Sequence, residues 1–270
     1  MRIKLIACDL DGTLLNSGHT VSERTRAAIN GARAAGARFC IITGRMFCSA
    51  VRFAEFLSLD TPLAAYNGAL IKGAANGRVY FSQPIDRETA QEILSFAKAN
   101  GFYLQKYVND RLYVEKINEK ARSYAQKVNV SAHAEGDAFY ELSAPPDKLL
   151  FIVDPAEKSA VAQAIERKFS GRVAITSSGP RFIEIIRIGV NKGEALAYIA
   201  RFLRVGRRDV MACGDSFNDL EMLDFAGLSV AMNNAAPEIR AAADFVSLNN
   251  DEDGVALAIE KYVLGRRLSS

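Results

Sequence analysis

The sequence predicts an α/β protein: a doubly wound parallel sheet whose chain is interrupted by an inserted α+β segment. In both outer thirds, short and nearly continuous apolar runs alternate with helix-forming stretches, which is typical of parallel strands joined by helices. In the middle third, strand-like runs are joined in pairs by short turns, which indicates antiparallel hairpins. We therefore expect a discontinuous core domain of residues 1–83 and 187–270, and an inserted α+β domain of residues 84–186.

The first third supplies three strands and two helices. Gly36 ends the first helix, and Asn67 with Gly68 marks a turn after the third strand. The strand–helix–strand order predicts parallel pairing with right-handed crossovers. The predicted strands are residues 3–8, 38–43 and 63–66, and the predicted helices are residues 22–35 and 46–57.

The middle third combines helices with antiparallel strands. Asn109-Asp110 and Ser178-Gly179-Pro180 are short turns, and each joins two strands into a hairpin. The predicted helices are residues 86–100, 117–128 and 156–169, and the predicted strands are residues 103–108, 111–115, 149–153, 173–177 and 181–186.

The last third returns to the pattern of the first. Asn191 is the expected N-cap of a helix, with Glu194 as its capping-box partner. The predicted helices are residues 192–203, 220–226 and 237–243 and a C-terminal helix, and the predicted strands are residues 209–213, 228–232 and 245–247.

Composition excludes several classes of protein. The 270 residues carry a net charge of only +3, and their basic side chains form no stripe, so we expect no nucleic-acid partner. No apolar run reaches the roughly 18 residues that a membrane span needs, so no membrane partner is expected. Cys8, Cys40 and Cys213 lie in apolar strand-like runs, and none of the four cysteines has metal-site spacing. This usage fits a reducing cytoplasm.

Acidic side chains follow two of the predicted strands. Asp9 and Asp11 end the first strand, and side chains two apart on a strand point to one face. Asp215 ends a strand of the last third, and parallel sheets bind ligands beyond these carboxyl ends. Each motif alone also fits a solvated turn or a capped helix. Together, Asp9, Asp11 and Asp215 offer the hard oxygen ligands that Mg²⁺ prefers.

Two further elements suit a phosphate group. Thr43 and Gly44 end the second strand, and they offer a hydroxyl and an N–H at the start of the next helix. Lys192 lies in the first turn of its helix, where the helix dipole disfavours a cation, so an anionic partner would explain its position. An ordinary surface lysine is the alternative interpretation.

In their order along the chain, which is Asp9, Thr43, Lys192 and Asp215, the four motifs resemble those of the haloacid dehalogenase superfamily (HAD). The inserted segment resembles the cap of its Cof-type subfamily (HAD hydrolase subclass IIB). The resemblance runs nearly from end to end and implies a Rossmann-like core. One departure is Asn191, where relatives often carry serine or aspartate. Further matching stretches are Tyr66-Asn67-Gly68-Ala69, Gly189-Val190-Asn191-Lys192-Gly193 and Val230-Ala231-Met232-Asn233-Asn234-Ala235.

The resemblance also implies a role for each motif residue. Asp9 would attack phosphorus and form an aspartyl-phosphate, and Asp11 would act as general acid and base. Mg²⁺ would be held by Asp9, the backbone carbonyl of Asp11 and Asp215, with Asp219 orienting Asp215. The groups implied to hold the phosphoryl oxygens are the backbone of Leu10, Thr43, Gly44, Lys192 and Asn218.

We therefore expect a Mg²⁺-dependent phosphatase for a small phosphorylated metabolite, such as a sugar phosphate or a phosphorylated cofactor. A phosphotransferase or phosphomutase would use the same intermediate and is the alternative. A non-enzymatic phosphoaspartate signalling module is a third hypothesis, disfavoured by Asp11 and by the inserted segment of about 100 residues. Oligomeric state is left open. Candidates in the inserted segment for substrate contact, with core packing or an ordinary surface position as the alternative, are Tyr103, Tyr107, Tyr113, Tyr140 and Arg181.

Overall fold

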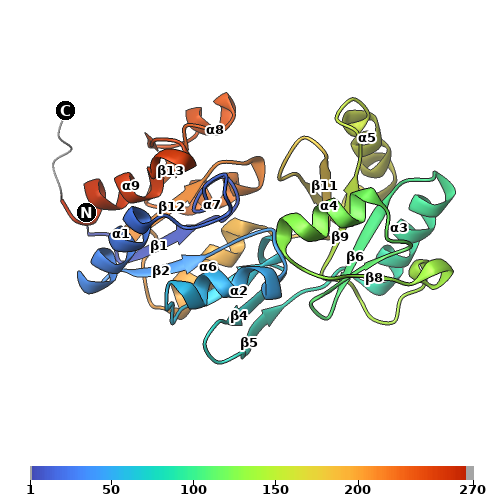
Figure 1. Ribbon diagram of the computed structural model, residues 1–270, viewed down its shortest axis with the longest axis horizontal. Helices are drawn as coiled ribbons and strands as arrows, with labels where there is room; N and C mark the ends of the chain where they lie inside the picture. The colour runs from blue at the N-terminus through green and yellow to red at the C-terminus, as the bar shows by residue number, and fades with distance from the viewer. Residues whose placement is uncertain (1, 266–270) are drawn as a thin grey trace.

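The computed structural model describes residues 2–265 and shows two lobes (Figure 1). The first lobe contains both ends of the described chain, and the second is formed by its middle third. The chain therefore leaves the first lobe once and returns to it.

A five-stranded parallel sheet lies at the centre of the first lobe, in the order β14-β13-β12-β1-β2. The chain moves from β1 to β2 on one side and returns on the other side at β12, so the strand order reverses between β1 and β12. Ligands of open α/β sheets bind at such a reversal. The strands are β1 (Leu5–Cys8), β2 (Arg38–Ile41), β12 (Val210–Gly214), β13 (Leu228–Ala231) and β14 (Phe245–Val246).

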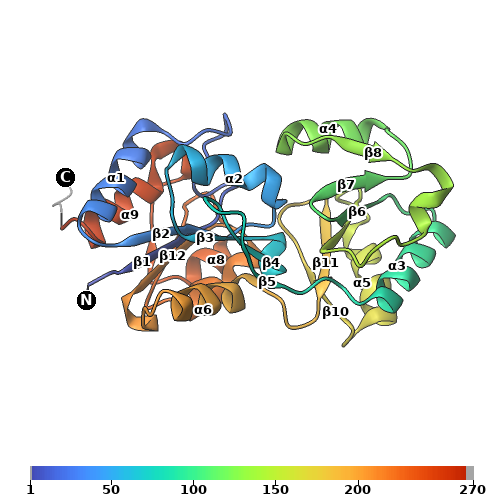
Figure 2. The ribbon, with the colours of Figure 1, turned by 90° about the horizontal axis from the view of Figure 1, so that it is seen from below.

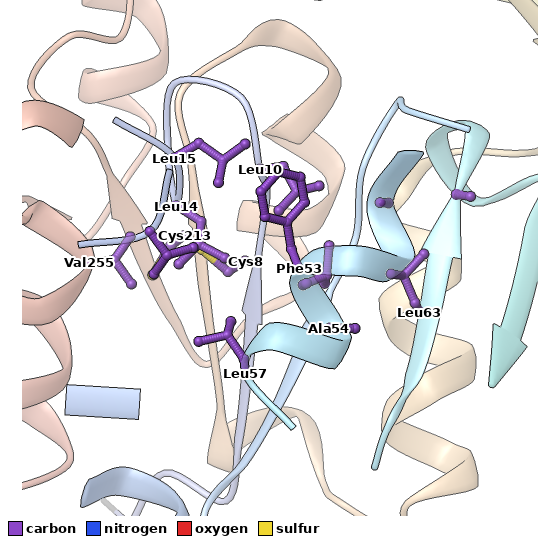
Figure 3. Packing of buried hydrophobic residues seen from close by; sticks show 14 of the residues in the cluster. Cys8, Leu10, Leu14, Leu15, Phe53, Ala54, Leu57, Leu63, Cys213 and Val255 are labelled. Atoms are coloured by element: carbon purple, nitrogen blue, oxygen red, sulfur yellow. The ribbon is translucent and has the colours of Figure 1, made fainter. Parts of the chain in front are cut away.

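Helices cover both faces of this sheet because its strands are apolar on both faces. Ile6 and Cys8 pack with α1, α2 and α9, whereas Leu5 and Ala7 pack with α6, α7 and α8. Figure 3 shows part of the first cluster, where Phe53 of α2 and Leu57, its C-cap residue, pack with Cys8 of β1. The helices are α1 (Glu23–Ala34), α2 (Phe47–Phe56), α6 (Lys192–Phe202), α7 (Leu220–Phe225), α8 (Pro237–Ala241) and α9 (Gly254–Tyr262).

The third predicted strand differs from expectation. β3 (Pro62–Ala65) meets the end of β2 through a single parallel bridge, between Ile42 and Ala64. It pairs mainly with β4 (Leu70–Gly73), which pairs in turn with β5 (Val79–Ser82), so the three form an antiparallel sheet. The sequence does not predict β4 and β5, because β5 is largely solvent-accessible and lacks the continuous apolar run of a buried strand.

A six-stranded sheet forms the second lobe, in the order β10-β11-β9-β6-β7-β8. Its pairs are antiparallel except for β7 with β8, and both predicted hairpins are present. The short edge strand β8 was not predicted. The strands are β6 (Leu104–Val108), β7 (Arg111–Val114), β8 (Ala132–Ala134), β9 (Lys148–Ile152), β10 (Val173–Thr176) and β11 (Phe182–Arg187).

The helices of the second lobe lie on both faces of this sheet. α3 (Arg87–Ala99) and α5 (Lys158–Phe169) cover one face, and α4 (Glu119–Val128) lies on the other (Figure 2). The cluster that contains α4 is continuous with the core of the first lobe. Among residues 2–265, no helix combines the length and the apolarity needed to cross a membrane.

The turn between β6 and β7 touches the first lobe. Its two residues, Asn109 and Asp110, have φ values of 51° and 58°, as a two-residue hairpin turn requires. The Asp110 carboxylate accepts hydrogen bonds from the Tyr66 hydroxyl (2.8 Å) and from the backbone N–H of Cys48 (2.9 Å). Met46, the N-cap residue of α2, supplies no side-chain cap. A residue of the second lobe therefore caps a helix of the first.

The burial of Asp147 can be tested through the pH dependence of folding stability. Burial, with a smaller contribution from Asp110, raises the pKa of Asp147 to about 6. Because the unfolded chain ionises at lower pH, folding loses stability as the pH rises through about 6. We expect Asp147→Asn to raise the free energy of unfolding by about 1–3 kcal/mol at pH 7.5, and to have little effect below pH 4. Denaturant unfolding at both pH values measures this, with the exposed Asp137→Asn as control. An equal gain at both pH values would contradict the assignment.

Candidate active site

A buried and a half-buried acidic side chain lie where the strand order reverses. Asp9 follows β1 and Asp215 follows β12, and these two strands are neighbours in the sheet. The N–H of Asp9 donates to the carbonyl of Cys213 (3.1 Å), which continues the pairing of the strands to the site. Carboxylate oxygens of Asp9, Asp215 and Asp219 lie within 4.8 Å of one another. The predicted convergence of Asp9 with Asp215 is therefore present.

Lys192 joins this acidic group from the start of α6. Its Nζ lies 2.6 Å from Asp9 Oδ1 and 2.6 Å from Asp219 Oδ1, and the lysine is only 1% exposed. Burial alone would lower the pKa of Lys192, but the adjacent carboxylates of Asp219 and Asp9 raise it. The lysine is therefore a buried ammonium, and the alternative of a surface lysine is excluded. Asn191 caps α6 as predicted, by accepting from the N–H of Glu194 (2.8 Å).

Asp219 is held on both of its oxygens. Oδ1 binds Lys192, and Oδ2 accepts from the backbone N–H groups of Asp215 (3.1 Å) and Ser216 (3.0 Å). Ser216 and Asp219 form a reciprocal capping box at the short 3₁₀ turn before α7. These bonds fix the loop that carries Asp215.

Asp215 is positioned from the other side by the loop after Asp9. The Thr13 hydroxyl donates to Asp215 Oδ1 (2.7 Å). Gly12 has a φ of 81°, and a Cβ at this position would lie 2.5 Å from Asp215 Oδ2. Only glycine therefore permits this close approach of the loop to the carboxylate. Burial and the nearby Asp219 raise the pKa of Asp215 to about 7.

Asp11 has a partner that the sequence analysis did not assign. Arg45 Nε and Nη2 bind the two carboxylate oxygens of Asp11 at 2.6 and 2.5 Å. The Arg45 side chain is 2% exposed and that of Asp11 is 36% exposed. Burial would raise the pKa of Asp11, but the guanidinium outweighs it and lowers the pKa. Such bidentate pairing fixes orientation as well as charge.

The loop after β2 offers hydrogen-bond donors beside Asp9. Thr43 is buried, and its Oγ1 accepts from the N–H of Arg45 (3.1 Å), so the hydroxyl proton of Thr43 is available for an anion. A Cβ on Gly44 would lie 2.9 Å from Asn67 Oδ1, so the loop approaches Asn67 closely at this point. Asn218 is buried and donates from Nδ2 to Asn67 Oδ1 (3.0 Å). Leu10, whose backbone was also predicted to bind phosphate, has a fully buried side chain.

A cavity of about 50 Å³ lies between the two lobes, beside Asp9. It has room for only a few water molecules. Asp9, Asp11, Thr43, Gly44 and Asn218 all line it. The side chains that the second lobe contributes are Tyr124, Lys127, Val128, Lys148, Ser178, Phe182 and Glu184.

The substrate-contact candidates from the sequence analysis do not line this cavity. Tyr107 packs in the interior, 5.9 Å from the Tyr66 ring. Tyr140 bonds to Glu115, and Arg181 pairs with Asp154 on the surface. Core packing or an ordinary surface position was the alternative for these residues; packing describes Tyr107, and a surface position describes Arg181.

The donor set fits a hard divalent cation. Three carboxylates face one ammonium, so the group keeps a net negative charge when all are ionised. Burial raises the pKa of Asp9 well above its usual range; Lys192 opposes this, and Asp219 and Asp215 add to it. A bound cation would relieve that repulsion. Asp219 is bound by an ammonium and by two backbone N–H groups, whereas Asp215 accepts, within residues 2–265, only from the hydroxyls of Thr13 and Ser216, so Asp215 is the better placed ligand of the two.

The missed residues had signals in the sequence. Arg45 directly follows Thr43-Gly44, and Asn67 lies in the matching stretch Tyr66-Asn67-Gly68-Ala69. Lys148 and Glu184 are single charges at the edge or in the middle of apolar strand runs. A charge buried in such a strand requires a partner, and that requirement was the available clue.

Comparisons with known proteins agree with this geometry. The family of haloacid dehalogenase-like hydrolases matches residues 6–259. YxeH of Bacillus subtilis, a putative phosphatase, is 32% identical over 270 residues, covering 97% of this chain and 99% of that protein. YcsE of the same organism, a 5-amino-6-(5-phospho-D-ribitylamino)uracil phosphatase, is 32% identical over 263 residues, covering 97% and 96%. A crystal structure of a haloacid dehalogenase-like hydrolase from Bacteroides thetaiotaomicron has a TM-score of 0.87 at 29% identity, covering 96% of this chain and 99% of that one. The chain therefore belongs to the haloacid dehalogenase-like hydrolases, as its motifs indicated, and is a phosphatase of the Cof type.

Proposed function

We propose that this phosphatase hydrolyses a monoester of a small phosphorylated metabolite through an aspartyl-phosphate on Asp9, with Mg²⁺ as cofactor. The observation that carries the proposal is the buried contact of Lys192 with Asp9 and Asp219, beside Asp215. This contact holds the Asp9 carboxylate in one orientation, and Lys192 neutralises part of the negative charge of the three carboxylates. Both features support Asp9 as the nucleophile. Most of the catalysis of phosphoryl transfer comes from positioning and charge neutralisation of this kind.

The proposal assigns a chemical role to each of the residues near the cavity. An oxygen of Asp9 attacks phosphorus, and Asp11 donates a proton to the leaving oxygen. Asp11 then takes a proton from the water that hydrolyses the aspartyl-phosphate, which regenerates both carboxyl groups. The ionised form of Asp11, favoured by Arg45, suits this second step. The groups proposed to hold the phosphoryl oxygens are the Leu10 backbone, Thr43, Gly44, Lys192 and Asn218.

Asp9, the backbone carbonyl of Asp11 and Asp215 would hold the metal ion. When bound, Mg²⁺ neutralises charge on the phosphoryl oxygens. The oriented Asp219 and the Thr13 hydroxyl keep Asp215 in place for it.

Residues 84–186 are proposed to form a cap domain on a core of residues 1–83 and 187–270. A neighbouring cavity of about 520 Å³ also reaches Lys192 and Asn218. The cavity that contains Asp9 is only about 50 Å³, too small for a sugar phosphate, so we propose that the cap separates from the core to admit substrate. The proposed substrates are sugar phosphates and phosphorylated cofactor precursors, the latter suggested by the printed function of YcsE. We place the reaction in the cytoplasm, consistent with four free cysteines of which three are buried.

Release of phosphate tests the reaction. Across a panel of sugar phosphates and 5-amino-6-(5-phospho-D-ribitylamino)uracil, we expect release with Mg²⁺, and we expect Asp9→Asn to lower kcat by about 10³-fold or more because it removes the nucleophile. Rapid acid quenching and mass spectrometry of the wild type should show one phosphoryl group on the Asp9 peptide. Asp137→Asn is the control. Unchanged turnover in Asp9→Asn would refute the nucleophile, and isomerised substrate without phosphate would instead establish a mutase.

Removal of metal should abolish this activity. We expect chelation by EDTA to stop phosphate release and added Mg²⁺ to restore it, because the three carboxylates need a cation. Asp215→Asn should raise the Mg²⁺ concentration for half-maximal rate by about tenfold or more, since it removes a ligand charge. The exposed Asp224→Asn should leave the Mg²⁺ dependence as in the wild type. Full activity in EDTA would contradict the proposed cofactor.

Arg45 gives a third test. Lysine cannot reproduce the bidentate contact, so we expect Arg45→Lys to lower kcat/KM by about 10- to 100-fold. Arg52→Lys is a matched control, because Arg45 and Arg52 both lie over the Phe53 ring, at 5.5 and 4.6 Å. Steady-state phosphate release measures both variants. Equal losses in the two would show that packing on Phe53, rather than the contact with Asp11, is what matters.

A further inference from the structure

Two buried charges of the second lobe reach into the site from β9 and β11. Lys148 is 1% exposed and Glu184 is 2% exposed, and they form an ion pair of 3.3 Å. Each also bonds to the first lobe: Lys148 Nζ donates to the carbonyl of Gly44 (2.7 Å), and Asn67 Nδ2 donates to Glu184 Oε2 (2.7 Å). A buried ion pair adds little net stability compared with apolar residues. Its contacts across the lobes therefore point to another role.

The first contact fixes a peptide unit of the proposed phosphate-binding loop. Lys148 holds the carbonyl of the Gly44–Arg45 peptide, and Thr43 Oγ1 accepts from its N–H (3.1 Å). Because a peptide unit is planar, bonds on both sides fix its orientation. The same N–H occupies an acceptor site of Thr43, which directs the hydroxyl proton elsewhere, toward the anion. Lys148 therefore acts on Thr43 through one peptide bond.

The second contact fixes the orientation of two side-chain amides, first that of Asn67 and through it that of Asn218. An ionised carboxylate only accepts hydrogen bonds, so Glu184 requires the NH₂ group of Asn67 on its side. Asn67 then turns its Oδ1 toward Asn218, which must donate from Nδ2 (3.0 Å). The Asn218 NH₂ group keeps a second hydrogen for a ligand. Glu184 thus sets the orientation of an amide that it does not touch.

The backbone around Asn67 supports this interpretation. Tyr66, Asn67 and Gly68 have φ values of 53°, 57° and 104°, three consecutive left-handed residues. For tyrosine this conformation is strained, and such strain persists where surrounding contacts enforce it, often at functional sites. Here the N–H groups of Tyr66 and Asn67 bond to the carbonyls of Arg45 and Thr43, both at 2.9 Å. These two hydrogen bonds therefore hold the strained turn against the proposed phosphate-binding loop.

We propose that Lys148 and Glu184 are positioning residues, which orient the Gly44–Arg45 peptide and the Asn67–Asn218 amides when the second lobe closes. The phosphoryl-binding groups are then complete only in the closed form, so that closure over a suitable leaving group is required for full catalysis. This inference rests on the proposed phosphatase site.

Lys148→Met and Lys106→Met form a matched pair of variants. Lys106 is also buried (2% exposed) and paired with a glutamate, Glu135, at 2.7 Å. Its hydrogen bonds go to the carbonyls of Phe139 and Glu141, both within the second lobe. We expect both variants to lower Tm, but only Lys148→Met to lower kcat/KM and orthophosphate affinity, each by about 10- to 100-fold.

A double variant separates positioning from stability. Lys148→Met/Glu184→Leu removes both charges, so its Tm should exceed that of Lys148→Met, in which Glu184 is buried without its partner. We expect kcat/KM and orthophosphate affinity to stay low in the double variant although Tm recovers. If Lys148→Met does not fold, the double variant carries the test alone.

Calorimetric titration with orthophosphate and Mg²⁺ distinguishes this inference from the proposed function, because it needs no turnover. Wild-type turnover together with wild-type phosphate affinity in the double variant would overturn the positioning role and leave the phosphatase intact. Absence of turnover in the wild type would overturn the proposed function, while a weaker phosphate affinity in the variants would still support positioning. Recovery of activity in step with Tm would also overturn the inference.

Discussion

The contact of Lys192 with Asp9 and Asp219 is the interaction on which the site depends. Asp9 and Lys192 are 183 residues apart in the chain, and their contact brings the start of α6 to the end of β1. The position is unfavourable for a cation with respect to the α6 dipole, so the two carboxylates must compensate. A Cβ on Gly193 would lie 2.6 Å from the carbonyl of Glu221, so the close packing of α6 on α7 needs glycine there. Helix packing and charge pairing therefore act together at this point.

The site divides its tasks between the lobes. The first lobe supplies the acidic group and Lys192 from strand ends and a helix start, where the fold itself determines position. The second lobe supplies Lys148, Glu184 and the wall of the cavity. In the proposed function the chemistry belongs to the first lobe, and the second lobe is the part that can differ with the leaving group.

Much of this architecture was predictable from sequence because it depends on local pattern. Buried parallel strands are continuous apolar runs, and Asp9 and Asp215 follow two of them directly. The β4–β5 hairpin was not predictable in this way because its exposed strand lacks such a run. The contact of Asp11 with Arg45 spans 34 residues of chain, that of Lys148 with Gly44 spans 104, and that of Glu184 with Asn67 spans 117. All three depend on tertiary approach. Periodicity carries no information at that range.

The capping of α2 by Asp110 has a consequence for the opening of the molecule. In the closed form this carboxylate satisfies the Cys48 N–H and the Tyr66 hydroxyl, two groups of the opposite lobe. Once the lobes part, the first turn of α2 is left with water in place of its cap, at a cost of about 1 kcal/mol for a lost N-cap. If the lobes part as proposed, the loss of this cap adds to the cost of opening, so a residue of the β6–β7 turn helps to set how often the cavity is accessible.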